Sequence, residues 1–106
     1  MPQAELREMF KAIGAQLTGE IGQVNFCELL TLRGHNSAHI VLSGTKGPIN
    51  VLFIRDSQMS WPQNISHDEL KGIILSMAWG NIAIIGVPEE PLDKVAERIN
   101  EGVRWL

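Results

Sequence analysis

The one cysteine and the three histidines are among the side chains whose chemistry allows metal binding or proton transfer: Cys27, His35, His39 and His67. His35 and His39 are four residues apart, which on a strand separates them by about 13 Å, because each residue adds about 3.3 Å. Since the surrounding residues predict a turn and a strand, the two imidazoles lie too far apart to bind one metal ion. We therefore expect no metal and no cofactor, and we interpret His39 as a partly buried, hydrogen-bonded side chain.

Cys27 is the only cysteine, which excludes an intramolecular disulfide and a zinc site made of cysteines alone. A single cysteine in an apolar strand usually behaves as a small buried hydrophobic residue. A metal- or ligand-binding enzyme site that uses His39 and Cys27, with or without His67, is an alternative. It requires these side chains to meet in one pocket.

Two short motifs resemble catalytic sequences and have structural explanations. Residues 66–68, Ser-His-Asp, are consecutive rather than converging, and no Gly-x-Ser-x-Gly elbow is present. Ser66 and Glu69 have the spacing of a capping box, which predicts a short helical turn. Residues 44–47, Gly-Thr-Lys-Gly, lack the spacing of a phosphate-binding loop and a following helix, so they predict a hairpin turn. We expect no catalytic residues and no enzymatic activity.

Two of the three tryptophans occupy positions that are difficult to bury. Trp61 lies in a break between predicted strands, and Trp79 lies at a predicted hairpin tip, whereas Trp105 adjoins an apolar helical stripe. Burial in the core is the usual fate of tryptophan, but tryptophan is also enriched where proteins bind one another. Trp79 and Trp61 are therefore our candidate protein-contact residues.

The composition describes an ordinary globular chain. Its 106 residues, 44% of them hydrophobic, are sufficient for one domain, which we expect to span residues 1–106. The net charge of −3, with its nine Lys and Arg scattered, excludes general binding of nucleic acid. No apolar run approaches the ~20 residues that span a bilayer, and the first residues lack a signal-peptide pattern. These features alone predict a soluble, cytosolic domain that is not inserted in a membrane.

Amphipathic patterns predict a helix near each end of the chain. Residues 2–17 carry apolar side chains at helical spacing, and glycines follow. This stripe consists of Leu6, Met9, Phe10, Ile13 and Leu17. The second helix starts at Pro91, where Glu89 and Glu90 favour the positive end of the helix dipole and need no catalytic role. Its stripe consists of Leu92, Val95, Ala96, Ile99, Val103 and Leu106.

Five apolar segments between these helices have the character of strands. Residues 38–43 and 49–54 flank the turn at 44–48, and because both of their faces are apolar we expect two central strands. Residues 23–32 predict a first strand with a bulge near Cys27, and residues 72–78 and 81–86 predict a second hairpin. Short connections favour antiparallel pairing. The sequence thus predicts an α+β fold, with about five mostly antiparallel strands packed by an N-terminal and a C-terminal helix.

Several segments along the chain match the sequence pattern of a known family. They are Gly22-Gln-Val-Asn-Phe-Cys27, His39-Ile-Val-Leu, Gly47-Pro-Ile-Asn-Val-Leu-Phe, Gly72-Ile-Ile-Leu, Gly80-Asn-Ile-Ala-Ile-Ile-Gly86 and the final Val103-Arg-Trp105. In these segments the chain resembles the C-terminal domain of a proteobacterial family of anti-sigma-factor-like inner-membrane proteins, a domain-of-unknown-function family. The resemblance implies a membrane-anchored parent protein with this domain in the periplasm.

The expected function follows from the fold and the resemblance. We expect a non-enzymatic, extracytoplasmic sensory or interaction domain of a membrane-anchored bacterial regulator, whose partner is a protein, a peptide or a second copy of itself. A half-covered antiparallel sheet has a face or an edge that can bind such a partner. A purely structural oligomerisation module is a further alternative.

Overall fold

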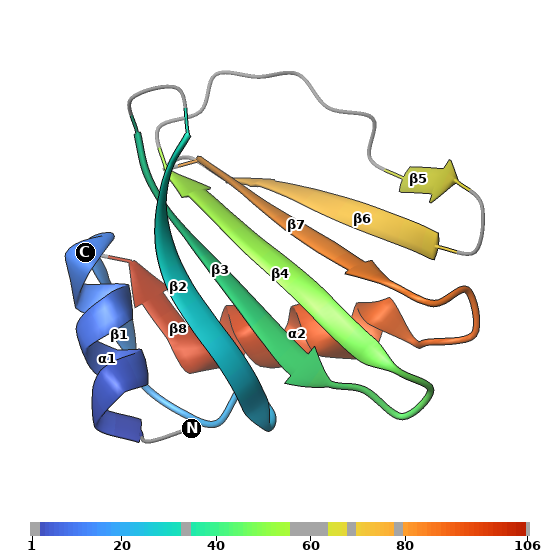
Figure 1. The fold of residues 1–106 in the computed structure, drawn as a ribbon, viewed down its shortest axis with the longest axis horizontal. Helices are drawn as coiled ribbons and strands as arrows, with labels where there is room; N and C mark the ends of the chain where they lie inside the picture. The colour runs from blue at the N-terminus through green and yellow to red at the C-terminus, as the bar shows by residue number, and fades with distance from the viewer. Residues whose placement is uncertain (1–2, 33–34, 56–63, 68–69, 78–79, 106) are drawn as a thin grey trace.

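The computed structural model describes residues 3–32, 35–55, 64–67, 70–77 and 80–105 (Figure 1). In chain order the elements are α1 (Gln3–Ala12), β1 (Ala15–Leu17), β2 (Val24–Leu32), β3 (His35–Ser43), β4 (Pro48–Arg55), β5 (Asn64–His67), β6 (Leu70–Met77), β7 (Gly80–Gly86), α2 (Leu92–Gly102) and β8 (Val103–Trp105).

The main sheet has the strand order β2-β3-β4-β7-β6-β5, and every neighbouring pair is antiparallel. It consists of five strands of seven to nine residues and the four-residue β5 at one edge. The predicted α+β class, with two terminal helices and an antiparallel sheet, is confirmed. β3 and β4 lie inside the sheet, as their two apolar faces predicted, and β2 forms the other edge.

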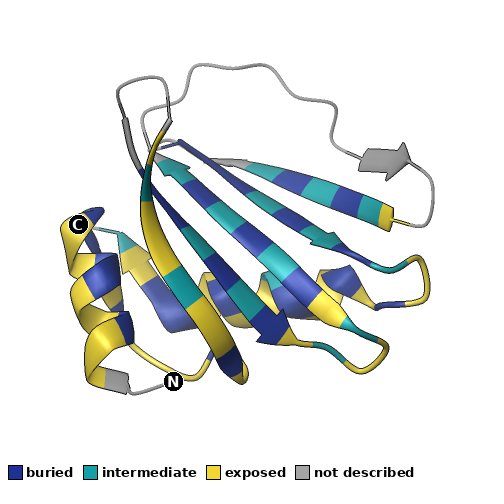
Figure 2. Ribbon diagram, viewed as in Figure 1, coloured by how far each residue is buried: buried dark blue, intermediate teal, exposed yellow. Residues whose placement is uncertain are grey.

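The hydrophobic core lies between one face of the sheet and the two helices. Alternate residues of β3 and β4 point into it and are almost fully buried: Ala38, Ile40 and Leu42, with Ile49, Val51 and Phe53. Figure 2 shows the resulting alternation of buried and half-buried residues along these strands, with α2 behind the sheet. α1 packs on the same face, because the ring of Phe10 meets that of Phe53 edge to face at 5.1 Å between centroids. We call this the helix side of the sheet and the opposite face the outer face.

Both helices end earlier than their apolar stripes predicted. The prediction of a helix over residues 2–17 was wrong beyond Ala12, because Gly14 takes a positive φ of 81° that ends the helix. The second helix ends at Gly102, before the last apolar residues of its stripe. Residues 15–17 and 103–105 instead form β1 and β8, which pair antiparallel in a small sheet of their own. The apolar residues Ala15, Leu17 and Val103 therefore reach the hydrophobic core from strands rather than from continued helices.

The helical turn predicted from the capping box at Ser66 was also wrong. Ser66 lies in β5, opposite Lys71 of β6, so pairing with a neighbouring strand overrides the local capping signal. β6 accordingly begins at Leu70 rather than at residue 72. The bulge predicted near Cys27 occurs two residues earlier, where the register of β2 shifts between Val24 and Phe26.

Candidate functional site at the edge strand

The predicted contact residues Trp61 and Trp79 lie outside the described residues, so their role stays a prediction. Trp105 is half-buried, and its ring lies 5.9 Å from that of Phe53. Among the residues whose side chains are described, the other candidates are His39 of β3 and Cys27 of β2.

The sheet separates Cys27 from His39. Cys27 lies opposite Ile40, a fully buried core residue, whereas Glu28 lies opposite His39. Because directly opposed residues share a face of the sheet, Cys27 points to the helix side and His39 to the outer face. Burial, with a smaller contribution from the Glu5 carboxylate, raises the pKa of the Cys27 thiol, the reverse of what activates a cysteine nucleophile. The enzyme alternative that uses both residues therefore has no shared pocket.

The described residues contain no group of three or more His, Cys, Asp or Glu side chains arranged to hold a metal ion. A hollow of about 360 Å³ lies between Leu6 of α1 and residues 17–24. Glu20 is the one ionisable side chain in its lining.

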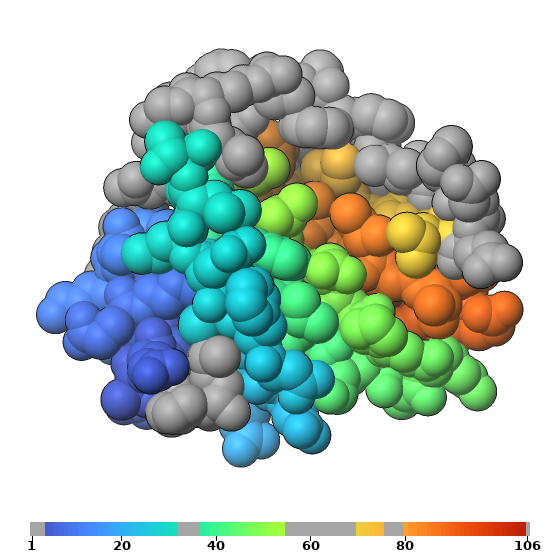
Figure 3. All heavy atoms as spheres, in the orientation of Figure 1, coloured from blue at the N-terminus to red at the C-terminus, as the bar shows by residue number. Residues whose placement is uncertain are grey.

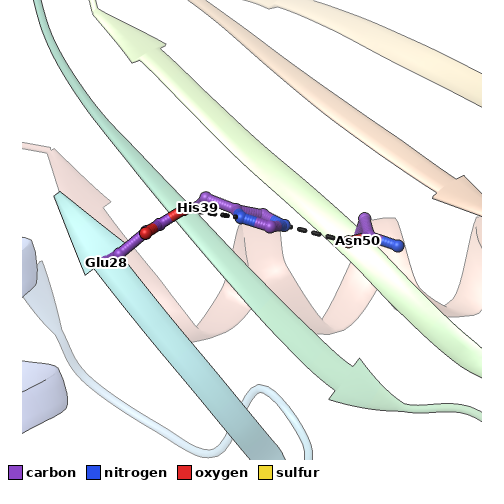
Figure 4. A network of polar contacts seen from close by, with 3 residues as sticks. All are labelled: Glu28, His39 and Asn50. Atoms are coloured by element: carbon purple, nitrogen blue, oxygen red, sulfur yellow. Dashed lines mark hydrogen bonds and ion pairs between the residues drawn. The ribbon is translucent and has the colours of Figure 1, made fainter. Parts of the chain in front are cut away.

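His39 joins three strands across the outer face (Figure 4). Its Nε2 lies 2.9 Å from Asn50 Oδ1 on β4, and its Nδ1 lies 3.4 Å from Glu28 Oε1 on β2. Both partners are hydrogen-bond acceptors as placed, so both contacts are hydrogen bonds only when the two ring nitrogens carry protons. The prediction of a partly buried, hydrogen-bonded His39 is confirmed, with 22% of its side chain exposed.

Phe26 extends this row at the start of the regular part of β2. Its ring meets the His39 imidazole edge to face, with 5.8 Å between centroids. Nearby, Asn25 Nδ2 donates a hydrogen bond of 2.6 Å to Ser43 Oγ on β3. These contacts hold β2 to the sheet through its outer face and leave its backbone edge unpaired in the described structure.

β2 is a long, apolar and weakly protected edge. Its nine residues, Val-Asn-Phe-Cys-Glu-Leu-Leu-Thr-Leu, include no lysine, no proline and a single charge, Glu28. Short length, charged side chains and proline are the usual features that prevent an edge strand from pairing with another chain. The other edge, β5, has only four residues. β2 is therefore the edge suited to accepting an added strand.

Two apolar side chains of β2 are exposed on opposite faces. Phe26 is 43% exposed on the outer face, and Leu29 is 51% exposed on the helix side. Leu29 lies directly opposite Ala38, which is fully buried. The packing that buries the helix side of β3 therefore does not extend over Leu29 of β2. Figure 3 shows the β2 side chains between the atoms of the N-terminal segment, in blue, and those of β3 and β4, in green.

A second polar arrangement joins the β3–β4 turn to the start of α2. Glu90 is 2% exposed, and its Oε2 accepts hydrogen bonds from the Thr45 backbone N–H at 3.1 Å and from the Thr45 hydroxyl at 2.9 Å. Its Oε1 accepts one from the Lys46 backbone N–H at 2.8 Å. These donors hold the pKa of the Glu90 carboxyl below its usual value, the Lys46 N–H contributing most.

The turn at residues 44–47 therefore binds an anion after all, and the anion is a carboxylate of the same chain. The hairpin turn was predicted and is confirmed by the pairing of Ser43 with Pro48. The role of Glu90 was missed, because helix-start acidic residues are usually exposed. The glycine-rich turn was the available signal, since successive backbone N–H groups in such turns form anion-binding concavities.

Comparisons with known proteins identify the family to which the chain belongs. No helix within the described ranges is long and apolar enough to cross a membrane. No curated protein and no solved structure matches the chain. Residues 2–103 match the family described as "Protein of unknown function (DUF3379)". Because this match covers nearly the whole chain, the protein belongs to that family of domains of unknown function.

Proposed function

We propose that this domain is a non-enzymatic interaction module that binds a protein or a peptide by accepting an extended strand at the edge of β2. The observation that carries the proposal is this nine-residue edge strand, which has one charge and two exposed apolar side chains. In strand addition the main-chain hydrogen bonds provide affinity, and alternate side chains provide specificity.

The two faces of β2 give an added strand different contacts. On the outer face, Phe26 and the aliphatic part of Glu28 flank the incoming side chains, and His39 Nδ1 lies 3.4 Å from the Glu28 carboxylate. On the helix side, the exposed Leu29 provides an apolar contact. A partner strand that alternates apolar and polar residues fits this surface, whereas a strand with an acidic residue opposite Glu28 does not.

The cellular setting of the proposal comes from the resemblance to anti-sigma-factor-like inner-membrane proteins. On that basis the domain is the periplasmic part of a membrane-anchored regulator, and strand addition at β2 is the event that it senses or transmits. A protein or peptide partner, rather than a nucleic acid, agrees with the net charge of −3.

Site-specific photocrosslinking tests this proposal. Phe26 is replaced by p-benzoylphenylalanine, which keeps an aromatic side chain, in the full-length protein in its host cell. The matched control places the same residue at Leu70, which is 50% exposed at the start of β6. We expect a covalent adduct from position 26 and none from position 70. No adduct at position 26, or equal adducts from both positions, would contradict the proposal.

A further inference from the structure

We infer that the strand which pairs with β2 is β2 of a second copy of this chain, antiparallel to the first and related to it by a two-fold axis through Leu29. The inference deepens the proposed function and rests on it. It specifies the partner, the register and the residue at the axis, and each of these has a separate consequence.

The geometry of β2 limits the register. For both copies to keep their helices on the same side of one continuous sheet, the two-fold axis must be perpendicular to the sheet and pass between two equivalent residues that face each other. After the shift between Val24 and Phe26, the pairing of β2 with β3 is regular from Phe26 to Leu32. Leu29 is the midpoint of these seven residues, so an axis there pairs all of them.

The competing registers are less favourable. An axis at Glu28 would place two carboxylates directly opposite each other, which is destabilising. An axis at Cys27 would use only three positions of the regular segment, residues 26–28, before the shifted register intervenes. The longest pairing that keeps the two Glu28 carboxylates apart is therefore the one centred on Leu29.

The side chains agree with this register. Leu29, which is 51% exposed, faces its own equivalent on the helix side, and each covers the other. Glu28 faces Leu30, so the one charge of the strand never meets itself. Cys27 faces Thr31, a pair of small side chains. Opposed side chains in antiparallel strands have Cβ atoms about 4.5–5.5 Å apart, close enough for Leu29 to pack on Leu29.

Pairing with a second copy also satisfies the unpaired backbone edge of β2 in both partners at once. Each copy pairs its nine-residue edge, and the described edges of the main sheet that remain are the four-residue β5 strands. Such an interface is self-complementary and closed, as in most homodimers. A different partner would cover β2 of one chain only and would need an unpaired strand of its own.

The inference is tested by light scattering, which measures the mass in solution, on variants that carry a charge at position 29. We expect the unmodified 106-residue chain to reach twice its mass of 11.8 kDa as concentration rises. Leu29→Lys places two ammonium groups face to face, so it should raise the dimer dissociation constant by about tenfold or more. Leu70→Lys is the matched control, since Leu70 is 50% exposed, and it should leave the dimer intact. An equimolar mixture of L29K and L29E should dimerise again.

Each outcome has a definite meaning, provided that circular dichroism shows all variants folded. A wild-type chain that stays monomeric overturns the inference, as does a dimer that L29K leaves intact. A dimer lost in L29K but not recovered in the L29K and L29E mixture overturns the axis at Leu29. If the chain is monomeric but position 26 crosslinks to another protein, self-pairing fails and the proposed function stands.

Discussion

The contact between the β3–β4 turn and Glu90 makes a sharp prediction about Gly44. A Cβ atom added at Gly44 would lie 2.4 Å from Glu90 Oε1 and 2.4 Å from the Gly47 carbonyl oxygen, whereas real Cβ contacts stay above 3.0 Å. The obstacle on one side is backbone, so the turn itself must move. Gly44→Ala should therefore displace the carboxylate from its backbone donors as well as strain the turn.

The expected cost is that of overpacking, about 1–3 kcal/mol. Replacing glycine also restricts the unfolded chain, which returns about 0.4–1 kcal/mol. The net cost is then about 1–2 kcal/mol. At about 4–8 °C per kcal/mol for a chain of this size, the melting temperature should fall by roughly 4–16 °C. Thermal unfolding followed by circular dichroism measures this shift, and urea unfolding gives the free energy.

Gly47→Ala is the matched control in the same turn. Its Cβ would meet the Val87 side chain at 3.5 Å, an ordinary van der Waals contact, and Gly47 has no positive φ. We expect its free energy of unfolding to stay within about 1 kcal/mol of the unmodified protein. Equal melting temperatures for G44A and G47A would refute the close approach of Glu90 to the turn.

Two further predictions concern Glu90 and the β2 edge. The folded-state pKa of Glu90 is lowered from 4.5, so the contribution of Glu90 to stability is present above that value and is lost as pH falls through the folded pKa. Glu90→Gln should therefore be less stable than the unmodified protein at pH 7, and the difference should shrink below about pH 4.5. The same pH dependence of stability in both proteins would contradict the contact. In the double variant Cys27→Ser/Leu29→Cys, mild oxidation should produce a disulfide-linked dimer, because the two residues at position 29 face each other at a distance that a disulfide can span. The control variant Cys27→Ser/Leu70→Cys should run as a monomer on a non-reducing gel. Equal amounts of linked dimer from both variants would argue against the register.

Local patterns predicted the parts of the fold that local interactions determine. The turn at residues 44–48 and its flanking strands were predicted because glycine, proline and alternating apolar residues act over a few positions. The apolar stripes of both helices were recognised for the same reason. These signals led to the correct α+β class and to the interior position of β3 and β4.

The errors arose where distant segments meet. Ala15 pairs with Trp105, and no short-range pattern indicates a partner so far along the chain. Ser66 had a good capping signal, but its pairing with Lys71 decided the outcome. The contact between Glu90 and the turn at residues 44–47 is of the same kind, since it joins positions 44 and 45 residues apart.

The candidate site was the least predictable feature. The sequence predicted strand 23–32 and its bulge but not that β2 forms an edge, because the order of strands in a sheet depends on long-range pairing such as that of β4 with β7. Exposure of Leu29 follows from that order and from the extent of the core beneath the sheet. Trp61 and Trp79 were selected on residue type, and their role as contact residues stays a prediction.

The identity of the photocrosslinked product from position 26 tests the central claim most directly. With Leu29 at the axis, Phe26 of one copy faces Leu32 of the other, so mass spectrometry should find the adduct on the β2 peptide of a second copy. An adduct on another protein would keep β2 as the binding edge and assign it a different partner. No adduct from position 26, or equal adducts from positions 26 and 70, would contradict the account of β2 as the binding edge.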